Sequence, residues 1–114
     1  MGKMQREKGK RFEREVANLF KEEGFKATRS AQCMGKTGQA ADVIGVPYLH
    51  IECKHVEQMK LYEWIAQAIR DTEAEGKGNL PCVIHKQNRK DILVSMRYED
   101  FIKIFIAYAR GVSE

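Results

Sequence analysis

Hydrophobic residues recur every three or four positions in three stretches of this chain, and this spacing predicts amphipathic helices. The first stretch covers residues 9–23, and Gly24 follows it where a glycine commonly ends a helix. The second begins at residue 61 and ends before the glycines at positions 76 and 78, and the third lies near the end of the chain. The apolar positions of these three predicted helices are Phe12, Val16, Leu19 and Phe20; Leu61, Trp64, Ile65, Ala68, Ile69 and Thr72; and Phe101, Ile102, Phe105, Ile106 and Ala109.

Short apolar runs between the predicted helices have the length and composition of β-strands. They cover residues 25–29, 43–46, 49–54, 80–85 and 92–96. The predicted order is αβββαββα, which indicates an α/β or α+β fold with one central sheet flanked by helices. No repeat, low-complexity tract or linker interrupts the chain, so residues 1–114 are predicted to form a single domain.

The predicted strand at residues 49–54 carries charged side chains within an apolar sequence. Because side chains alternate between the two faces of a strand, His50, Glu52 and Lys54 share one face, and the apolar residues between them share the other. A strand in the core of a small protein would normally carry no charged side chains, so this charged face suggests a catalytic or metal-binding role.

Asp42 directly precedes the strand at residues 43–46, and a bend over residues 45–48 can fold the two strands into a hairpin. The hairpin would bring Asp42 near Glu52, and Mg²⁺ is commonly bound by one or two carboxylates together with waters and substrate phosphate oxygens. Lys54 could then orient or deprotonate the attacking water. The polar segment at residues 30–41 is predicted as a mobile loop bordering this site. On spacing alone, a solvated strand edge with a salt bridge explains these residues equally well.

The length and composition of the chain exclude several classes of protein. A chain of 114 residues with 43% hydrophobic content can build one core but is small for an enzyme acting on duplex DNA. No apolar stretch approaches the roughly 20 residues of a membrane span, so we expect a soluble intracellular protein without membrane association. Three cysteines without paired spacing, Cys33, Cys53 and Cys82, predict no disulfides. A zinc site is not expected either, because strand alternation separates Cys53 from His50.

Positive charge is concentrated in the first third of the chain. Residues 1–38 carry ten Lys/Arg and five Asp/Glu, although the net charge of the whole chain is only +4. Such a cluster suits a protein that holds a polyanion such as DNA. Arg11 and Lys36 are candidate DNA contacts within it, and residues 1–9 are predicted to be a flexible basic start. For any single basic residue, ordinary solvation is the simpler interpretation.

The order of helix, strand, glycine-containing loop, Asp strand, Glu-x-Lys strand and helix resembles the restriction-endonuclease-like, or PD-(D/E)xK, nuclease superfamily over nearly the whole chain. Within it, GKRFEREVANLFKEEGFKATRS followed by AADVIGVPYLHIECKH is similar to the archaeal-type Holliday-junction resolvases and their small phage relatives. Ala41 stands where the superfamily name has proline, which the resolvase branch tolerates. The virus-type replication-repair nucleases usually carry Gly-x-Pro-Asp there.

The resemblance implies a restriction-endonuclease-like core with a central mixed sheet and a catalytic set of Asp42, Glu52 and Lys54. A glutamate of the first helix completes the metal site in that family, and Glu13 occupies the matching place, with Glu15 as the alternative. Without the family, a helix-surface ion pair would be the preferred interpretation of Glu13.

Three further residues are carried over from the same resemblance. Arg29 and Ser30 match a pair that lies close to the phosphates in resolvases, although a strand-end cap explains them nearly as well. Gln67 resembles a glutamine on the helix after Glu-x-Lys, near the catalytic lysine, and it could equally be a surface residue.

Histidines and aromatic residues near the motif have simpler explanations than catalysis. His50 and His55 could act as general bases, but their positions favour solvated histidines at a strand end. Tyr48, Tyr62 and Trp64 could stack on bases, but Trp64 lies on the apolar stripe of its helix and is predicted to be core.

The sequence therefore predicts a metal-dependent DNA endonuclease that uses Mg²⁺, with Mn²⁺ as a substitute, and cuts branched DNA such as Holliday junctions. It would act in recombination and repair, in the cytoplasm, or in the host cytoplasm if a phage encodes it. The alternatives are a flap, nick or duplex nuclease with the same site, and a DNA-binding module without catalysis.

A homodimer is predicted, because a four-way junction is itself roughly two-fold symmetric and its resolution needs paired cuts. The apolar stripe of the last helix and the edge strand at residues 92–96 are the surfaces most available for it. The same stripe could instead pack against the sheet.

Overall fold

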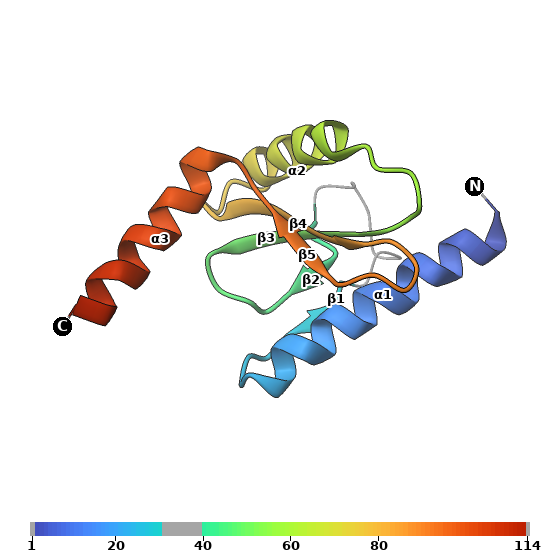
Figure 1. Ribbon diagram of the computed structural model, residues 1–114, viewed down its shortest axis with the longest axis horizontal. Helices are drawn as coiled ribbons and strands as arrows, with labels where there is room; N and C mark the ends of the chain where they lie inside the picture. Colours follow the sequence, from blue (N-terminus) through green and yellow to red (C-terminus); the bar gives the residue numbers. More distant parts are fainter. Residues whose placement is uncertain (1, 31–39, 114) are drawn as a thin grey trace.

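The computed structural model describes residues 2–30 and 40–113, and these form three helices and a five-stranded sheet in the predicted order (Figure 1). The predicted loop at residues 30–41 falls mostly on residues 31–39, outside the described part of the chain, as do Cys33 and Lys36. The elements are α1 (Lys3–Glu22), β1 (Thr28–Arg29), β2 (Val43–Ile44), β3 (Leu49–His55), α2 (Leu61–Glu75), β4 (Leu80–Lys86), β5 (Leu93–Ser95) and α3 (Tyr98–Ser113).

The sheet is mixed, and its strands follow one another in chain order, β1-β2-β3-β4-β5. Strands β1, β2 and β3 pair antiparallel, β3 and β4 pair parallel, and β4 and β5 pair antiparallel. A parallel pair needs a long crossover connection, and α2 supplies it between β3 and β4. The predicted central mixed sheet with flanking helices is confirmed.

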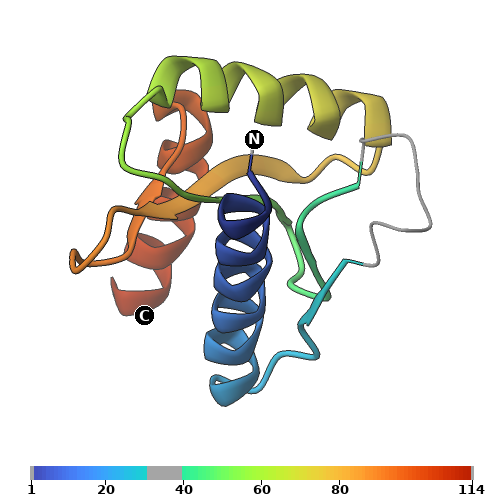
Figure 2. The same ribbon diagram turned by 90° about the vertical axis from the view of Figure 1, so that its right-hand side faces the viewer.

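Helices α1 and α2 cover opposite faces of the sheet (Figure 2), and each face has its own hydrophobic cluster. On the α1 side, Phe12 and Val16 pack against Ile51 and neighbouring strand residues. On the α2 side, the cluster consists of Trp64, Ala68 and Val83, which confirms the predicted core role of Trp64. The central strand β3 is therefore covered on both faces, and its polar residues His50 and Glu52 are buried together with its apolar ones.

Helix α1 begins at Lys3, six residues before the predicted start at Gly9. Residues 3–9, which were predicted to belong to a flexible basic start, are thus the first two turns of this helix. The single apolar side chain among residues 3–8, Met4, is 81% exposed and forms no repeating apolar pattern, so hydrophobic periodicity could not detect this stretch. Its lysine, glutamine, arginine and glutamate residues nevertheless have high helix propensity, and the helix continues through Gly9.

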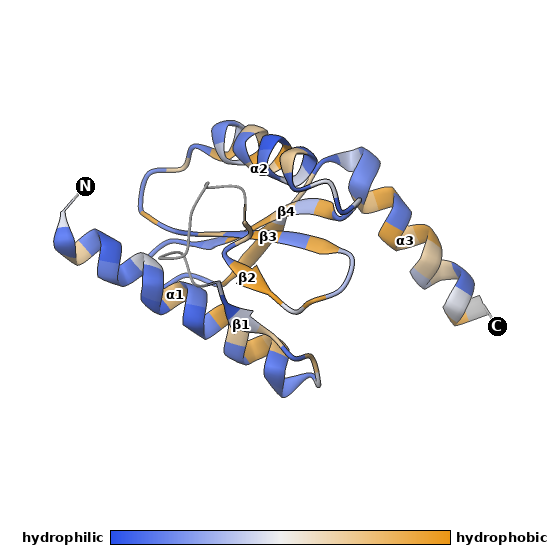
Figure 3. Ribbon diagram, turned by 180° about the vertical axis from the view of Figure 1, so that it is seen from behind, coloured by the Kyte–Doolittle hydropathy of each residue, from blue (hydrophilic) through white to orange (hydrophobic). Residues whose placement is uncertain are grey.

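Helix α3 projects away from the sheet at the end of the chain (Figure 1). Phe101, Ile104, Phe105 and Ile106 are each between 39% and 48% exposed, so the apolar stripe predicted on this helix is not covered by the sheet. The hydrophobic residues along it are visible in Figure 3. None of the three described helices, α3 included, combines the length and apolar character that crossing a membrane requires.

Candidate active site

The β2–β3 hairpin brings Asp42 and Glu52 together. Val43 pairs with Ile51 in the antiparallel register, so the preceding Asp42 lies opposite the following Glu52. The main-chain N–H of Asp42 donates to the carbonyl of Ile51 at 2.8 Å, and the N–H of Cys53 donates to Asp42 Oδ2 at 2.8 Å. These bonds fix the Asp42 carboxylate beside the strand that carries Glu52 and Lys54.

Gly45 makes the tight connection between the two strands possible. Its φ of +92° lies in a region that side-chain-bearing residues rarely adopt. A Cβ at this position would also collide with the main-chain carbonyl of Lys26, which precedes β1. A glycine is therefore required here for β2 to pack against its neighbours and present Asp42 in register with Glu52.

Asp42 lies in an environment that disfavours its charge. Burial and the nearby charge of Glu52 raise its pKa from 3.8 to about 8, and Glu13 adds a smaller effect of the same sign. The N–H of Cys53 and the charge of Lys54 oppose the rise. Two carboxylates this close need a cation to be ionised together, which is the electrostatic setting of a divalent-metal site.

The donor set fits a cation that keeps much of its water. No group of three or more His, Cys, Asp or Glu side chains is arranged as a metal cluster within residues 2–30 and 40–113. Mg²⁺ commonly takes only one or two carboxylates, with waters and substrate oxygens as its remaining ligands. The Asp42–Glu52 pair matches this pattern, whereas a structural zinc site would need four protein ligands.

Glu13 projects from α1 toward the hairpin and is held by β1. Arg29 Nε donates a hydrogen bond of 2.7 Å to Glu13 Oε1, and both side chains are mostly buried. The charge of Glu13 is close enough to raise the pKa of Asp42. Glu15 is exposed on the same helix, so the structure places Glu13, rather than Glu15, next to the carboxylate pair.

Lys54 is half-buried on β3, two residues after Glu52. It lines a cavity of about 300 Å³ together with Glu13 and Arg29, and it also lines a second cavity of about 470 Å³. The charge of Lys54 also lowers the pKa of Asp42, which shows that it lies near the carboxylate pair. Helix α1, strand β3 and the segment before β2 thus bring together Glu13, Asp42, Glu52 and Lys54.

Of the other predicted site residues, only some lie next to the carboxylate pair. The main-chain N–H of buried Ser30 donates to the carbonyl of Asp42 at 2.8 Å, so Ser30 does lie beside the site. Arg11 is exposed on α1, and Gln67 is half-buried on α2. None of the contacts found within the described residues joins Gln67 to Asp42 or Lys54. Lys36 lies outside the described residues.

His50 contradicts its predicted solvated position. It is 0% exposed, and its Nε2 lies 2.9 Å from Glu52 Oε2 while its Nδ1 lies 2.9 Å from Glu75 Oε1. Burial by itself would lower the pKa of His50, but the hydrogen bonds and charges of Glu52 and Glu75 outweigh it and raise this pKa above 6.5. The prediction failed because α2 covers this face of β3. The sequence did indicate that His50 and Glu52 lie on the same face of the strand, and this spacing could have predicted their contact.

A polar network at the rim of the site was also missed. His55 Nε2 lies 3.0 Å from Asn88 Oδ1, and Lys8 Nζ donates to the same oxygen at 3.1 Å. The N–H of Asn88 donates to Glu57 Oε2 at 2.7 Å. His55 is therefore half-buried and bonded rather than freely solvated, and burial lowers its pKa. Because Lys8 and Asn88 are 80 residues apart, no local pattern could reveal this contact.

Two of the three cysteines lie in the described part of the chain. Cys53 and Cys82 are both free and buried. Burial and the neighbouring charge of Glu52 raise the pKa of Cys82 to about 12, and burial raises that of Cys53 well above its ordinary value. Both thiols are therefore protonated at neutral pH, and as thiols they are not ready metal ligands.

Comparisons with known proteins agree with this geometry. The structure of Hjc from Archaeoglobus fulgidus, a Holliday junction resolvase from an archaeal hyperthermophile, is similar to the chain with a TM-score of 0.56 and 29% sequence identity. The similarity covers 74% of this chain and 72% of that one. Among curated protein sequences, none matches. The family described as "Phage putative PDDEXK endonuclease" matches residues 4–111, so the chain belongs to this family and is a nuclease of the PD-(D/E)xK type.

Proposed function

We propose that this nuclease is a metal-dependent endonuclease that hydrolyses phosphodiester bonds in branched DNA such as Holliday junctions. The observation that carries the proposal is the placement of Asp42 opposite Glu52, with Lys54 on the same strand as Glu52. Burying charged side chains such as these costs free energy, and an apolar strand would be easier to bury in this core. Their presence here therefore favours a functional role over a structural one.

In this proposal Asp42 and Glu52 bind Mg²⁺, and Mn²⁺ can replace it. The raised pKa of Asp42 supports this, because a divalent cation would relieve the repulsion between the two carboxylates. When bound, the metal lowers the pKa of a coordinated water and offsets charge on the phosphate. Glu13, oriented by Arg29, supports the metal or one of its waters.

Lys54 is proposed to position the attacking water. Lys54 lines both cavities next to the site, and its charge acts on Asp42, so a phosphate in either cavity could reach this residue. A lysine at such a place can hydrogen-bond the water and the phosphate oxygen at once. Ser30, Arg29 and Gln67 remain candidates for contacts to the substrate.

Two features support DNA as the substrate, and branched DNA in particular. Basic residues surround the cavities that border Lys54, namely Arg6, Lys8, Lys10, Arg29 and Lys60. The similar Archaeoglobus protein is itself a Holliday junction resolvase. We expect this nuclease to act in the cytoplasm, since its proposed substrate lies there.

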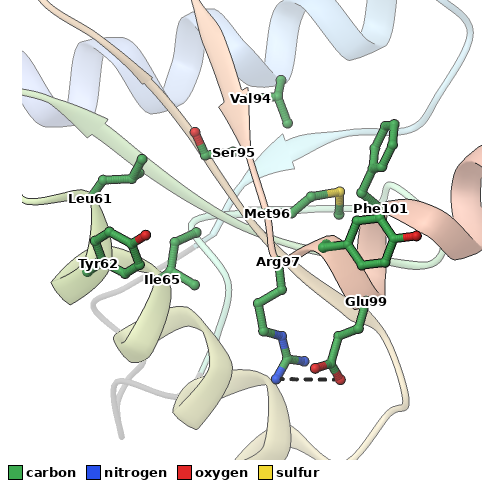
Figure 4. Close-up of a pocket in the computed structure, with 10 residues that line it drawn as sticks. Leu61, Tyr62, Ile65, Val94, Ser95, Met96, Arg97, Glu99 and Phe101 are labelled. Carbon is green, nitrogen blue, oxygen red and sulfur yellow. Dashed lines mark ion pairs between the residues drawn. The ribbon is translucent and has the colours of Figure 1, made fainter.

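A homodimer is part of the proposal, with α3 and the β5 edge as its interface. β5 ends the sheet, and its Leu93 and Val94 are 52% and 63% exposed. A hollow of about 710 Å³ lies between the start of α2, β5 and the start of α3 (Figure 4). Exposed apolar side chains on α3 adjoin this hollow at Phe101. A second copy covering them would place two sites on one junction.

One assay tests the function most directly. A labelled four-way junction, a matched duplex and a flap are incubated with the protein in Mg²⁺ or in EDTA. We expect paired, symmetric cuts in the junction that depend on the metal. Preferential cutting of the flap or duplex would favour the alternative nuclease, and junction binding without any cutting in Mg²⁺ or Mn²⁺ would favour a non-catalytic module.

A further inference from the structure

The strand that carries Glu52 also carries a fully buried histidine whose two ring nitrogens both face carboxylates. His50 Nε2 lies 2.9 Å from Glu52 Oε2, and His50 Nδ1 lies 2.9 Å from Glu75 Oε1. Glu52 is 5% exposed, and Glu75 is the last residue of α2. The three side chains form a chain of hydrogen bonds from the end of a helix to the carboxylate pair.

We propose that His50 is a positioning residue that orients the metal-binding carboxylate of Glu52, and that Glu75 in turn orients His50. This inference rests on the proposed role of Glu52 as a metal ligand. A carboxylate has freedom about its last torsion angle, and a bond to one of its oxygens fixes the direction of the other. Such outer contacts are a known determinant of metal affinity.

The local structure explains why a histidine is needed at this position. Residues 50 and 52 lie on the same face of β3, two positions apart, and the imidazole is long enough to reach both Glu52 and the end of α2. Glu75 is fixed there because Gly76, in a left-handed conformation with φ +71°, ends α2 immediately after it. A shorter polar side chain could contact only one of the two carboxylates.

The alternative is that the histidine merely satisfies a buried polar site. His85 offers a matched comparison, since it is also buried, on the neighbouring strand β4, and lies under the same helix α2. Its Nε2 lies 2.8 Å from the hydroxyl oxygen of Ser95 instead of a carboxylate. Replacing either histidine should cost stability, but only His50 should affect metal binding.

The test measures Mn²⁺ affinity of the DNA-free protein by titration calorimetry or by Mn²⁺ electron paramagnetic resonance. We expect H50A to weaken Mn²⁺ binding by about 10- to 100-fold, the usual effect of removing an outer partner of a ligand. H85A should leave the affinity within about 3-fold of wild type. Thermal melting identifies the folded fraction of each variant, and affinities are compared for folded protein only.

Two isosteric variants separate the contacts. An amide at the end of a Gln side chain reaches the place of Nε2, whereas that of Asn reaches the place of Nδ1. H50Q should therefore restore Mn²⁺ affinity toward wild type because it can donate to Glu52, and H50N should not. If the His50 variants do not fold, E75A provides a second test. It removes only Glu75, the outer residue of the hydrogen-bonded series, and should still weaken Mn²⁺ binding.

The outcomes distinguish this inference from the proposed function. If wild type does not bind Mn²⁺, or if D42N binds it as tightly as wild type, the metal assignment itself fails. If wild type binds Mn²⁺ and D42N does not, but H50A, H50N and E75A all bind as wild type does, the positioning role of His50 is wrong. Equal losses in H50A and H85A would likewise overturn it.

Discussion

Arg29 donates a hydrogen bond of 2.7 Å from its Nε to Oε1 of Glu13, and this contact fastens β1 to α1 directly beside Asp42. The two side chains are only 24% and 15% exposed. Removing either partner leaves a mostly buried charge without its counterpart, so the pair is a structural element of the site as well as a candidate part of its chemistry.

Glu13→Gln tests which glutamate of α1 belongs to the site. We expect cutting to fall by at least about 10-fold, because the amide carries no charge to support a metal or its water. Glu15→Gln is the matched control, since Glu15 is exposed on the same helix, and it should cut at the wild-type rate. The opposite pattern, measured in single-turnover cleavage, would assign the role to Glu15.

Asp42→Asn and Glu52→Gln should each abolish cutting while leaving DNA binding in place. Each change removes one carboxyl group from a pair that the metal-free fold disfavours in its doubly ionised form, so the apo protein should be as stable as wild type or more stable. Cleavage and gel-shift assays measure the first effect, and thermal melting in EDTA measures the second. A variant that cuts at a near wild-type rate in Mg²⁺ would show that its carboxylate is not required.

Lys54→Ala separates a catalytic lysine from a salt-bridging one. We expect single-turnover cleavage to slow by about 10² to 10⁴, which is typical of losing a general base or a positioned water. Mn²⁺ binding should persist, since the carboxylates remain. The competing result is a lower melting temperature with unchanged cleavage by the folded fraction, which would make Lys54 a structural residue.

The stability of the metal-free protein should fall as the pH rises. The pKa of Asp42 is raised from 3.8 to about 8, so between about pH 4 and pH 8 the folded state holds a proton that the unfolded chain has released. The raised pKa of His50 acts in the same direction above pH 6.5. Melting in EDTA from pH 5 to pH 9 should therefore show a decline that is smaller in Asp42→Asn. If the melting temperature of wild type falls no more steeply with pH than that of Asp42→Asn, this prediction is wrong.

Charge placed on α3 should disrupt the proposed dimer. Phe105→Asp introduces a carboxylate into an apolar stripe that is 47% exposed at this residue, so the fold should tolerate it while association does not. Sedimentation should give a single chain mass of 13.1 kDa for the variant and about twice that for wild type. Tyr48→Asp, at an exposed position of the hairpin turn, is the control and should stay dimeric. A monomeric wild type, free and on a junction, would favour the flap or duplex alternative.

The order of elements was predictable because each has a local signature. Helical periodicity identified α2 and α3, and apolar runs identified the strands, including β4, whose predicted span of residues 80–85 differs from Leu80–Lys86 by one residue. The start of α1 was missed because helix propensity without an apolar face leaves no periodic pattern.

The core of the site was predictable as well. Alternation along β3 places Glu52 and Lys54 on one face, and a hairpin of the observed length brings Asp42 opposite Glu52. These relationships depend on residues within 13 positions of one another, so they follow from strand geometry alone.

The sequence by itself thus determined the fold class, the hairpin and the carboxylate pair, because these rest on local periodicity and short-range pairing. Only the tertiary structure decided that α2 buries His50 between Glu52 and Glu75, that Glu13 rather than Glu15 meets Arg29, and that the stripe on α3 stays uncovered. Each of these depends on which surfaces pack together across long stretches of chain, and burial of a side chain is a property of its packed neighbours and not of its own identity.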